Sequence, residues 1–184
     1  MVKQDIQLTD GFVTLRPYRA EDSEAMYEAV RESIPEISKW MEWCTPAFSM
    51  EQSRDFVESC PEAWEDETAF GFAITDAVTG RYLGGCGLNR IRYDLGMANL
   101  GYWVRTGATK KGVATATTRL LAGFGFDELD LNRIELVIDA ENLASQRVAE
   151  KAGAIKEGIL RNRLTRDHLP VNALMFSLLP GDIG

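Results

Sequence analysis

The segment from Tyr102 to Thr115 constrains the fold more than any other part of this chain. It runs from an apolar strand through a turn with Lys110, Lys111 and Gly112 directly into a helix. The first N–H groups of a helix have no intrahelical partner, and the helix macrodipole places partial positive charge there. A glycine at such a turn lets a ligand approach the backbone, which suits a phosphate or pyrophosphate. An ordinary strand-to-helix connection is the alternative, and the spacing matches neither a Walker A loop nor a Rossmann fingerprint.

Hydrophobic periodicity and turn residues predict an alternation of strands and helices over the remaining chain. We expect Ser49 to cap the helix 50–66, with Phe56 and Val57 facing inward, Pro35 to break an earlier helix, and Pro61 to break or kink the helix 50–66. The expected strands are 12–16, 70–74, 82–88, 98–105, 133–139, 154–161 and 171–179, and the expected helices are 21–31, 37–41, 50–66, 113–127 and 142–151.

This order of elements predicts a single mixed α/β (α+β) domain over residues 1–184. A chain of 184 residues is long enough to bury a substantial core without disulfides. No linker, internal repeat or low-complexity tract interrupts it. The chain is therefore read as one folding unit.

Composition narrows the classes of partner. The net charge of −8 argues against nucleic acid, whose binding depends on basic residues that neutralise phosphates. No apolar run reaches the ~18 residues of a membrane span, and the opening segment 1–6 lacks the apolar core of a signal peptide. The scattered Cys44, Cys60 and Cys86 show no metal-binding or disulfide spacing, so we expect no metal site and a cytoplasmic protein.

A second motif runs from Asn142 to Gly153, after the strand 133–139. Asn142 suits a helix N-cap, Ser145 can support that cap from the third helical position, and Gly153 suits the left-handed C-terminal position. Each of these residues, taken alone, is explained by structure as well as by function.

Taken together, the two motifs resemble the GNAT superfamily of N-acetyltransferases that use acyl-CoA, and most closely its RimJ/RimL-type branch of ribosomal-protein N-acetyltransferases. The segments 13–17, 101–103 and 157–161 also match this pattern, so the resemblance spans nearly the whole chain. It implies a strongly bent mixed sheet of about seven strands flanked by helices. It also implies that this sheet is splayed where the strand ending at Arg105 parts from the strand 133–139.

The resemblance also implies the site for acetyl-CoA, with no metal. The pantetheine arm would pair like a strand with Trp103, Val104 and Arg105, while Asn142 would hydrogen-bond to it and Ser145 would lie near the thioester sulfur. The pyrophosphate would be held by the Thr115 hydroxyl and by backbone amides of Lys110, Lys111, Gly112, Val113 and Ala114.

The chain departs from the family pattern at three places. Thr109 stands where Gln or Arg is usual, and Leu100, preceded by Asn99, stands where many relatives have glutamate. No tyrosine follows Tyr102, although many members use a later tyrosine to protonate the leaving thiolate. Here the group that protonates the thiolate would be Ser145 or water.

The acceptor is left open between a protein N-terminus, such as that of a ribosomal protein, and a small amine (an amino acid, polyamine or aminoglycoside). A third alternative is a non-catalytic protein that binds acetyl-CoA. As to oligomeric state, a homodimer is common among similar proteins. An α-amine with a pKa of roughly 8 is more readily deprotonated than a lysine near 10.4, which mildly favours the N-terminus because no base stands out. Segment 40–43 could line the acceptor groove or belong to the core. The carboxylates considered as bases are Asp139, Glu141 and Glu157, each equally explained as a solvated or capping group, whereas His168 in the turn 166–170 is read as a loop residue.

Overall fold

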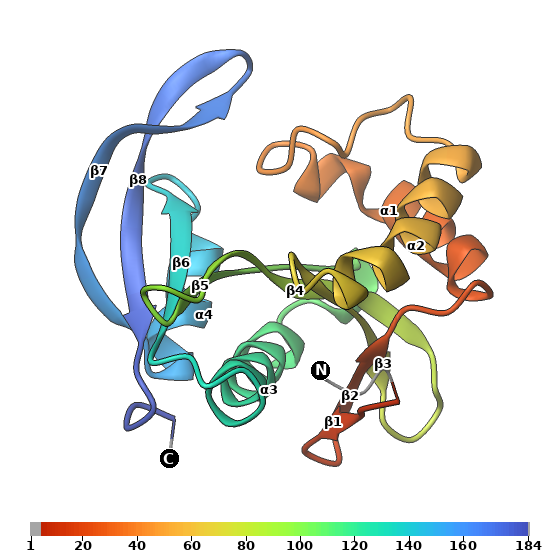
Figure 1. Cartoon of the computed structure of the whole chain (residues 1–184). Helices are drawn as coiled ribbons and strands as arrows, with labels where there is room; N and C mark the ends of the chain where they lie inside the picture. Colours follow the sequence, from red (N-terminus) through yellow and green to blue (C-terminus); the bar gives the residue numbers. More distant parts are fainter. Residues whose placement is uncertain (1–4, 184) are drawn as a thin grey trace.

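The computed structural model describes residues 5–183, which form one eight-stranded sheet flanked by helices (Figure 1). We expect no signal peptide from the segment 1–6. Of these residues, 1–4 lie outside the described part of the chain. The strands are β1 (Leu8–Thr9), β2 (Val13–Pro17), β3 (Phe70–Asp76), β4 (Tyr82–Arg92), β5 (Met97–Val104), β6 (Arg133–Asp139), β7 (Ile155–Arg166) and β8 (Leu169–Leu178). The helices are α1 (Asp22–Ile37), α2 (Met50–Glu65), α3 (Val113–Asp127) and α4 (Leu143–Ala152), with a short 3-10 turn at Thr106–Ala108.

The sheet divides between β5 and β6. Its strand order is β1-β2-β3-β4-β5-β6-β8-β7, and β5 runs parallel to β6 whereas the other neighbouring strands are antiparallel. The parallel pairing joins Met97–Asn99 to Arg133–Glu135 and extends no further along the described strands. The residues of β5 after Asn99 therefore leave one strand edge without a β partner, which confirms the splay that the family resemblance implies.

Helices cover both faces of the sheet because successive strand residues point to opposite sides. In β3, Phe72 packs in the larger core cluster, where its ring meets Phe124 of α3 at 5.1 Å between centroids. The next residue, Ala73, belongs to the second cluster with Met26 of α1. Figure 1 shows α1 and α2 together on one side and α3 beneath the middle of the sheet.

Proline does not break the helices as expected. Pro35 lies inside α1, which continues to Ile37, and residues 38–40 form a turn, so the short helix predicted near 37–41 is wrong. A proline costs a helix one backbone hydrogen bond, and Ser33 and Ile37 on either side of Pro35 are buried. Packing of the last turn against the rest of the protein thus offsets that loss. Pro61 likewise lies within α2 without ending it.

The capping prediction for α2 is confirmed, and one burial prediction is wrong. Ser49 accepts a hydrogen bond from the Gln52 N–H, and the Gln52 side chain accepts one from the Ser49 N–H in return. Val57 is buried, but Phe56 is 44% exposed. That exposed ring lies at the cavity described below.

Candidate functional site

The open edge of β5 presents alternate backbone groups. In an antiparallel pair, residues alternate between those that hydrogen-bond to the neighbouring strand and those whose N–H and C=O point away from it. The Arg105 N–H donates to the Leu83 carbonyl of the β4 side at 2.8 Å, so it is not free for a ligand. Trp103 pairs in register with Gly85 in the same direction. Tyr102 and Val104 therefore point their backbone groups toward the splay, and Val104 is the available donor among the three residues expected to pair there.

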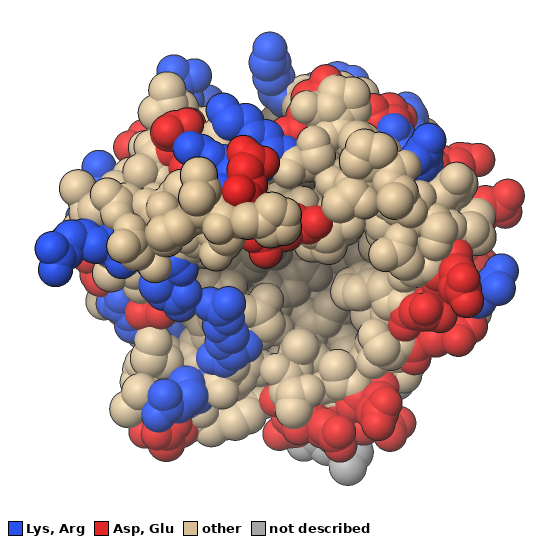
Figure 2. All heavy atoms as spheres, turned by 90° about the horizontal axis from the view of Figure 1, so that it is seen from above, with Lys and Arg blue, Asp and Glu red and all other residues tan. Residues whose placement is uncertain are grey.

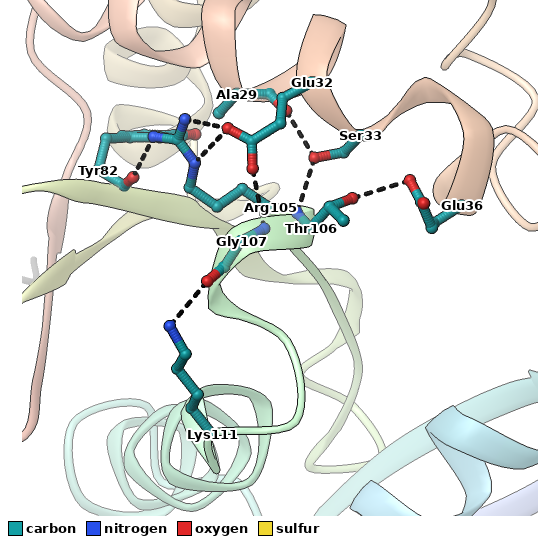
Figure 3. A network of polar contacts seen from close by, with 9 residues as sticks. All are labelled: Ala29, Glu32, Ser33, Glu36, Tyr82, Arg105, Thr106, Gly107 and Lys111. Atoms are coloured by element: carbon teal, nitrogen blue, oxygen red, sulfur yellow. Dashed lines mark hydrogen bonds and ion pairs between the residues drawn. The ribbon is translucent and has the colours of Figure 1, made fainter.

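The turn after β5 is fixed by α1 (Figure 3). The Gly107 N–H donates to a Glu32 carboxylate oxygen at 2.8 Å, and the Thr106 N–H donates to the Ser33 hydroxyl at 2.9 Å. The Arg105 guanidinium forms an ion pair with Glu32 and holds the pKa of that carboxyl below its usual value. These contacts position the chain before it enters the Lys110–Gly112 turn.

A row of amide groups follows without acceptors. From Lys110 to Thr115, no backbone N–H donates a hydrogen bond to another group in the described chain, and the first bond of α3 is Ala116 N–H to Gly112 C=O. Gly112 precedes the helix in the left-handed conformation at φ +90°, and no side chain caps the helix there. The donors expected at Lys110, Lys111, Gly112, Val113 and Ala114 are thus available to an anion, and the half-buried Thr115 lies beside them.

The two lysines of the turn are not directed alike. Lys110 adopts a left-handed backbone at φ +60° and is exposed. The Lys111 ammonium donates to the Gly107 carbonyl at 2.9 Å, as Figure 3 shows. Lys111 therefore helps to close the turn, and the backbone amides remain the main candidates for anion binding.

The start of α4 lies across the splay from β5. Asn142 caps this helix, because its side-chain oxygen accepts the Ser145 N–H at 3.0 Å, and the Asn142 side-chain NH₂ keeps its donors free within the described chain. Gly153 ends α4 in the left-handed conformation at φ +103°, as predicted. Asn142 and Ser145 therefore both serve the helix start, and the Ser145 hydroxyl also lies 2.9 Å from the Tyr102 hydroxyl of β5.

Tyr102 is the functional candidate that sequence reasoning missed. Its hydroxyl lies 2.9 Å from the Ser145 hydroxyl, which joins β5 to α4 across the splay. Burial raises the pKa of Tyr102 to about 12, so the phenol stays protonated at neutral pH. Alternation along β5 predicts that Tyr102 shares a face with Leu100, but only the packing of α4 against the sheet brings it to Ser145.

A cavity of about 480 Å³ lies beside the same strand. It is bounded by α1, α2, the loop between these helices, and β3 to β5, and Tyr102 and Trp103 are among its lining residues. Met41 and Trp43 of the segment 40–43 also line it, whereas Trp40 carries Lys39 over its ring at 4.5 Å. Seen from above, the molecule is hollowed between the β7–β8 side and the α1–α2 side (Figure 2). The floor of the hollow consists of residues other than Asp, Glu, Lys and Arg, and some charged residues stand at its rim.

The carboxylates considered as bases are held by arginines. Asp139 and Glu141 both contact Arg166, at 3.1 Å and 2.9 Å. Glu157 accepts hydrogen bonds from both terminal nitrogens of Arg133 at 2.7 Å. These ion pairs lower the pKa of Glu141 and bring that of Glu157 to about 2, so neither is a strong base.

His168 lies elsewhere, exposed in the turn between β7 and β8 with a left-handed backbone at φ +62°. This agrees with its reading as a loop residue. In residues 5–183 no three His, Cys, Asp or Glu side chains gather as a metal-binding group, and no helix is long and apolar enough to cross a membrane.

The Glu157 ion pair gives a prediction for acid stability. The folded-state pKa of about 2 lies below the ordinary value of 4.5, so this carboxylate stabilises the fold above about pH 4.5 and loses that effect as the pH falls toward 2. We expect Glu157→Gln to lower the free energy of unfolding at pH 7 and to leave it unchanged near pH 2. Urea unfolding of both proteins from pH 2 to pH 7 measures the difference.

The matched control is Glu58→Gln, since Glu58 is exposed on α2 and no ion pair involves it among the described residues. We expect little effect of this change at any pH. If the free energy of unfolding of the wild type exceeded that of Glu157→Gln by the same amount from pH 7 to pH 2, the stabilising role of the Glu157 ion pair would be refuted.

The fold agrees with the protein family that this chain resembles. The model of the acetyltransferase (GNAT) domain matches residues 13–155, so the chain belongs to the GNAT family. The uncharacterized N-acetyltransferase p20 of Bacillus licheniformis is 32% identical over 167 residues, which cover 91% of this chain and 92% of that protein. The chain is therefore an N-acetyltransferase.

Two solved structures of similar fold allow a comparison with the ribosomal-protein acetyltransferases. A Vibrio cholerae protein provisionally assigned as a ribosomal-protein-serine acetyltransferase superposes with a TM-score of 0.85 at 28% identity, covering 97% of this chain and all of that one. RimJ of Mycobacterium smegmatis, solved in complex with CoA-disulfide, superposes with a TM-score of 0.85 at 21% identity over 96% of this chain and 87% of RimJ. The resemblance to the RimJ/RimL-type branch is confirmed.

Proposed function

We propose that this chain transfers an acetyl group directly from acetyl-CoA to a primary amine, namely the N-terminal α-amine of a polypeptide. The observation that carries this proposal is the open edge of β5, which is followed, after the turn 105–109 whose amides are bonded within the protein, by a second set of free donors. The first set is the unpaired backbone of Tyr102 and Val104, and the second is the unpaired amides of residues 110–115. A pantetheine arm with a pyrophosphate requires such a strand edge followed by a cluster of N–H donors.

The donor residues fit acetyl-CoA in chemical type. Amide N–H groups at a helix start match phosphate oxygens, and the edge of β5 matches the two amides of pantetheine. The free NH₂ of Asn142, at the start of α4, would add a donor. When bound, acetyl-CoA supplies the activated acetyl thioester.

The protein's own groups would then act on charge and protons. The Val104 N–H would donate to the acetyl carbonyl oxygen and stabilise negative charge that develops there. The Ser145 hydroxyl would give its proton to the departing sulfur, and the Tyr102 hydroxyl would hold Ser145 in position. No charged side chain lines the cavity in the described chain, so the acceptor amine would lose its proton to water.

A terminal α-amine suits this arrangement better than a lysine side chain. Near pH 7.4 about one-fifth of α-amines with a pKa of roughly 8 are neutral, against about a thousandth of lysines near 10.4. A site without a base therefore favours the amine that is already neutral. The hollow in Figure 2 opens to the outside, which allows a chain terminus to enter.

Release of free thiol from acetyl-CoA tests this proposal with a panel of amines. We expect turnover of peptides with a free N-terminus, and at least tenfold lower kcat/KM when that terminus is blocked and an internal lysine is the sole amine. Calorimetry of acetyl-CoA binding provides the second measurement. Equal turnover of blocked and free peptides would contradict the α-amine assignment, and binding without thiol release for every amine would indicate a non-catalytic protein.

A further inference from the structure

The cavity beside β5 has an uncharged lining. Among residues 5–183 no Asp, Glu, Lys, Arg or His side chain borders it, although more than a quarter of the sequence is charged (26%). Gln52 and Asn89 supply polar groups. Its volume of about 480 Å³ is typical of small-ligand pockets, roughly 300–1,000 Å³. The large apolar side chains around it include Met26, Met41, Trp43, Phe48, Phe56 and Trp103.

Two of these aromatic side chains remain partly open to water. Trp43 is 41% exposed and Phe56 is 44% exposed. The Trp43 ring nevertheless has a defined place, because it meets the rings of Phe48 at 5.8 Å and Trp103 at 5.9 Å between centroids. A ligand that covered these rings with apolar atoms would be favoured by the hydrophobic effect.

The sheet keeps this space free with glycine. Gly71, Gly87 and Gly101 lie side by side in register on β3, β4 and β5. A Cβ at Gly87 would meet the Phe70 carbonyl at 2.8 Å, so packing explains that glycine. A Cβ at Gly101 would meet nothing closer than the Asn89 side chain at 4.0 Å. Glycine inside a strand weakens it, and close approach of a ligand is one reason to keep it.

The cavity also borders one residue assigned to the reaction, Tyr102, whereas Ser145 and Val104 are not in its lining. Tyr102 lines it and hydrogen-bonds to Ser145. A group carried next to the acceptor amine would therefore enter the cavity when the amine approaches the acetyl group. A second ammonium, as in a polyamine or aminoglycoside, would find no charged partner there, and burying an unpaired charge is costly.

We propose that this cavity selects acceptors that carry an aromatic or branched aliphatic group beside the primary amine. The inference rests on the proposed function and specifies its substrate class. Either an N-terminal apolar residue or a small arylalkylamine offers this chemistry, and the experiment below separates the two sources. Small N-terminal residues and polycations are the acceptors that the cavity disfavours.

The first test compares peptides that differ in their first residue alone. Each buried methylene contributes about fourfold in an equilibrium or specificity constant, so we expect Phe or Leu to exceed Ala or Ser at least tenfold in kcat/KM. Phenethylamine, ethylamine and spermidine form the small-amine arm, in which phenethylamine should be the best acceptor. Equal kcat/KM for phenylalanyl, alanyl and seryl peptides and for spermidine would overturn the inference. Thiol release from no amine would instead overturn the proposed function.

A pair of glycine variants tests the cavity itself. Gly101→Leu would fill it, and we expect kcat/KM to fall about tenfold or more for the phenylalanyl peptide and much less for the alanyl peptide. Gly158→Leu is the control, because a Cβ at Gly158 on β7 meets nothing within 4 Å and Gly158 is not in the cavity lining. Equal loss for both peptides, or for both variants, would contradict the inference.

Ligand binding without turnover provides a measurement that needs no variant. Trp43 and Trp103 line the cavity, so occupancy should change tryptophan fluorescence. We expect phenethylamine to titrate this signal at least tenfold more tightly than ethylamine. Indistinguishable titrations would overturn the inference even if Gly101→Leu failed to fold.

Discussion

Gly112→Val is expected to weaken acetyl-CoA binding about 100-fold, since the chain would no longer hold its amide donors in place. Gly112 precedes α3 at φ +90°, a conformation in which a β-branched residue is strongly disfavoured. Relief of that strain would turn the amides of residues 110–115 away from their common direction. Displacement of binding groups by about 1 Å can cost on the order of 100-fold. Calorimetric Kd for acetyl-CoA and kcat/KM measure the effect.

Two other variants separate this effect from instability and from loss of charge. Gly80→Val introduces the same kind of strain at φ +71° in the β3–β4 turn, where a Cβ meets nothing within 4 Å. We expect it to lower stability without changing the acetyl-CoA Kd. Lys111→Ala removes an ammonium group that donates to the Gly107 carbonyl. We expect the affinity for acetyl-CoA to fall less than about tenfold. If Gly112→Val bound acetyl-CoA like Gly80→Val, the backbone cradle would be the wrong assignment.

Ser145→Ala is expected to lower kcat about 100-fold while the acetyl-CoA Kd changes only a few-fold. A positioned proton donor typically contributes on the order of 100- to 10,000-fold, and water can replace part of this contribution. Tyr102→Phe removes the hydroxyl that bonds to Ser145 at 2.9 Å and should lower kcat about tenfold. Because the two hydroxyls act as one unit, the double variant should be no slower than Ser145→Ala alone.

The control for this pair is Ser23→Ala, which likewise removes a serine hydroxyl, in this case one that donates to the Ala20 carbonyl just before α1. We expect no change in kcat from it. Unchanged kcat in Ser145→Ala would exclude the serine as proton donor. Strictly multiplicative losses in the double variant would show that Tyr102 does not act through Ser145.

Local sequence patterns predicted most of the elements. Ser49 and Asn142 form the helix caps read from the sequence, and Gly153 ends α4 as expected. These features depend on a residue and its neighbours three or four positions away, so periodicity and cap chemistry are sufficient. Pro35 was misread because the packing of Ser33 and Ile37 offsets a local preference, and such packing involves distant residues.

The candidate site was predicted in part for the same reason. The amides at the start of α3 depend on one glycine and one helix start, both of which are local. Hydrogen bonding across strands is not local. The Arg105 N–H, expected at the ligand edge, is used by Leu83, which lies 22 positions earlier. The choice of Val104 as donor follows from strand alternation and requires the register of β4 and β5.

The sequence by itself determined the family, the strand–turn–helix unit that follows Tyr102, and the caps of α4, because each is written in consecutive residues. Only the tertiary structure decided the contact of Tyr102 with Ser145 and the uncharged cavity floored by Gly101. Tyr102 and Ser145 lie on different elements, and their contact depends on how α4 packs beside a sheet that has parted at β5. The acceptor preference thus arises from the space left between elements, which no single segment of sequence describes.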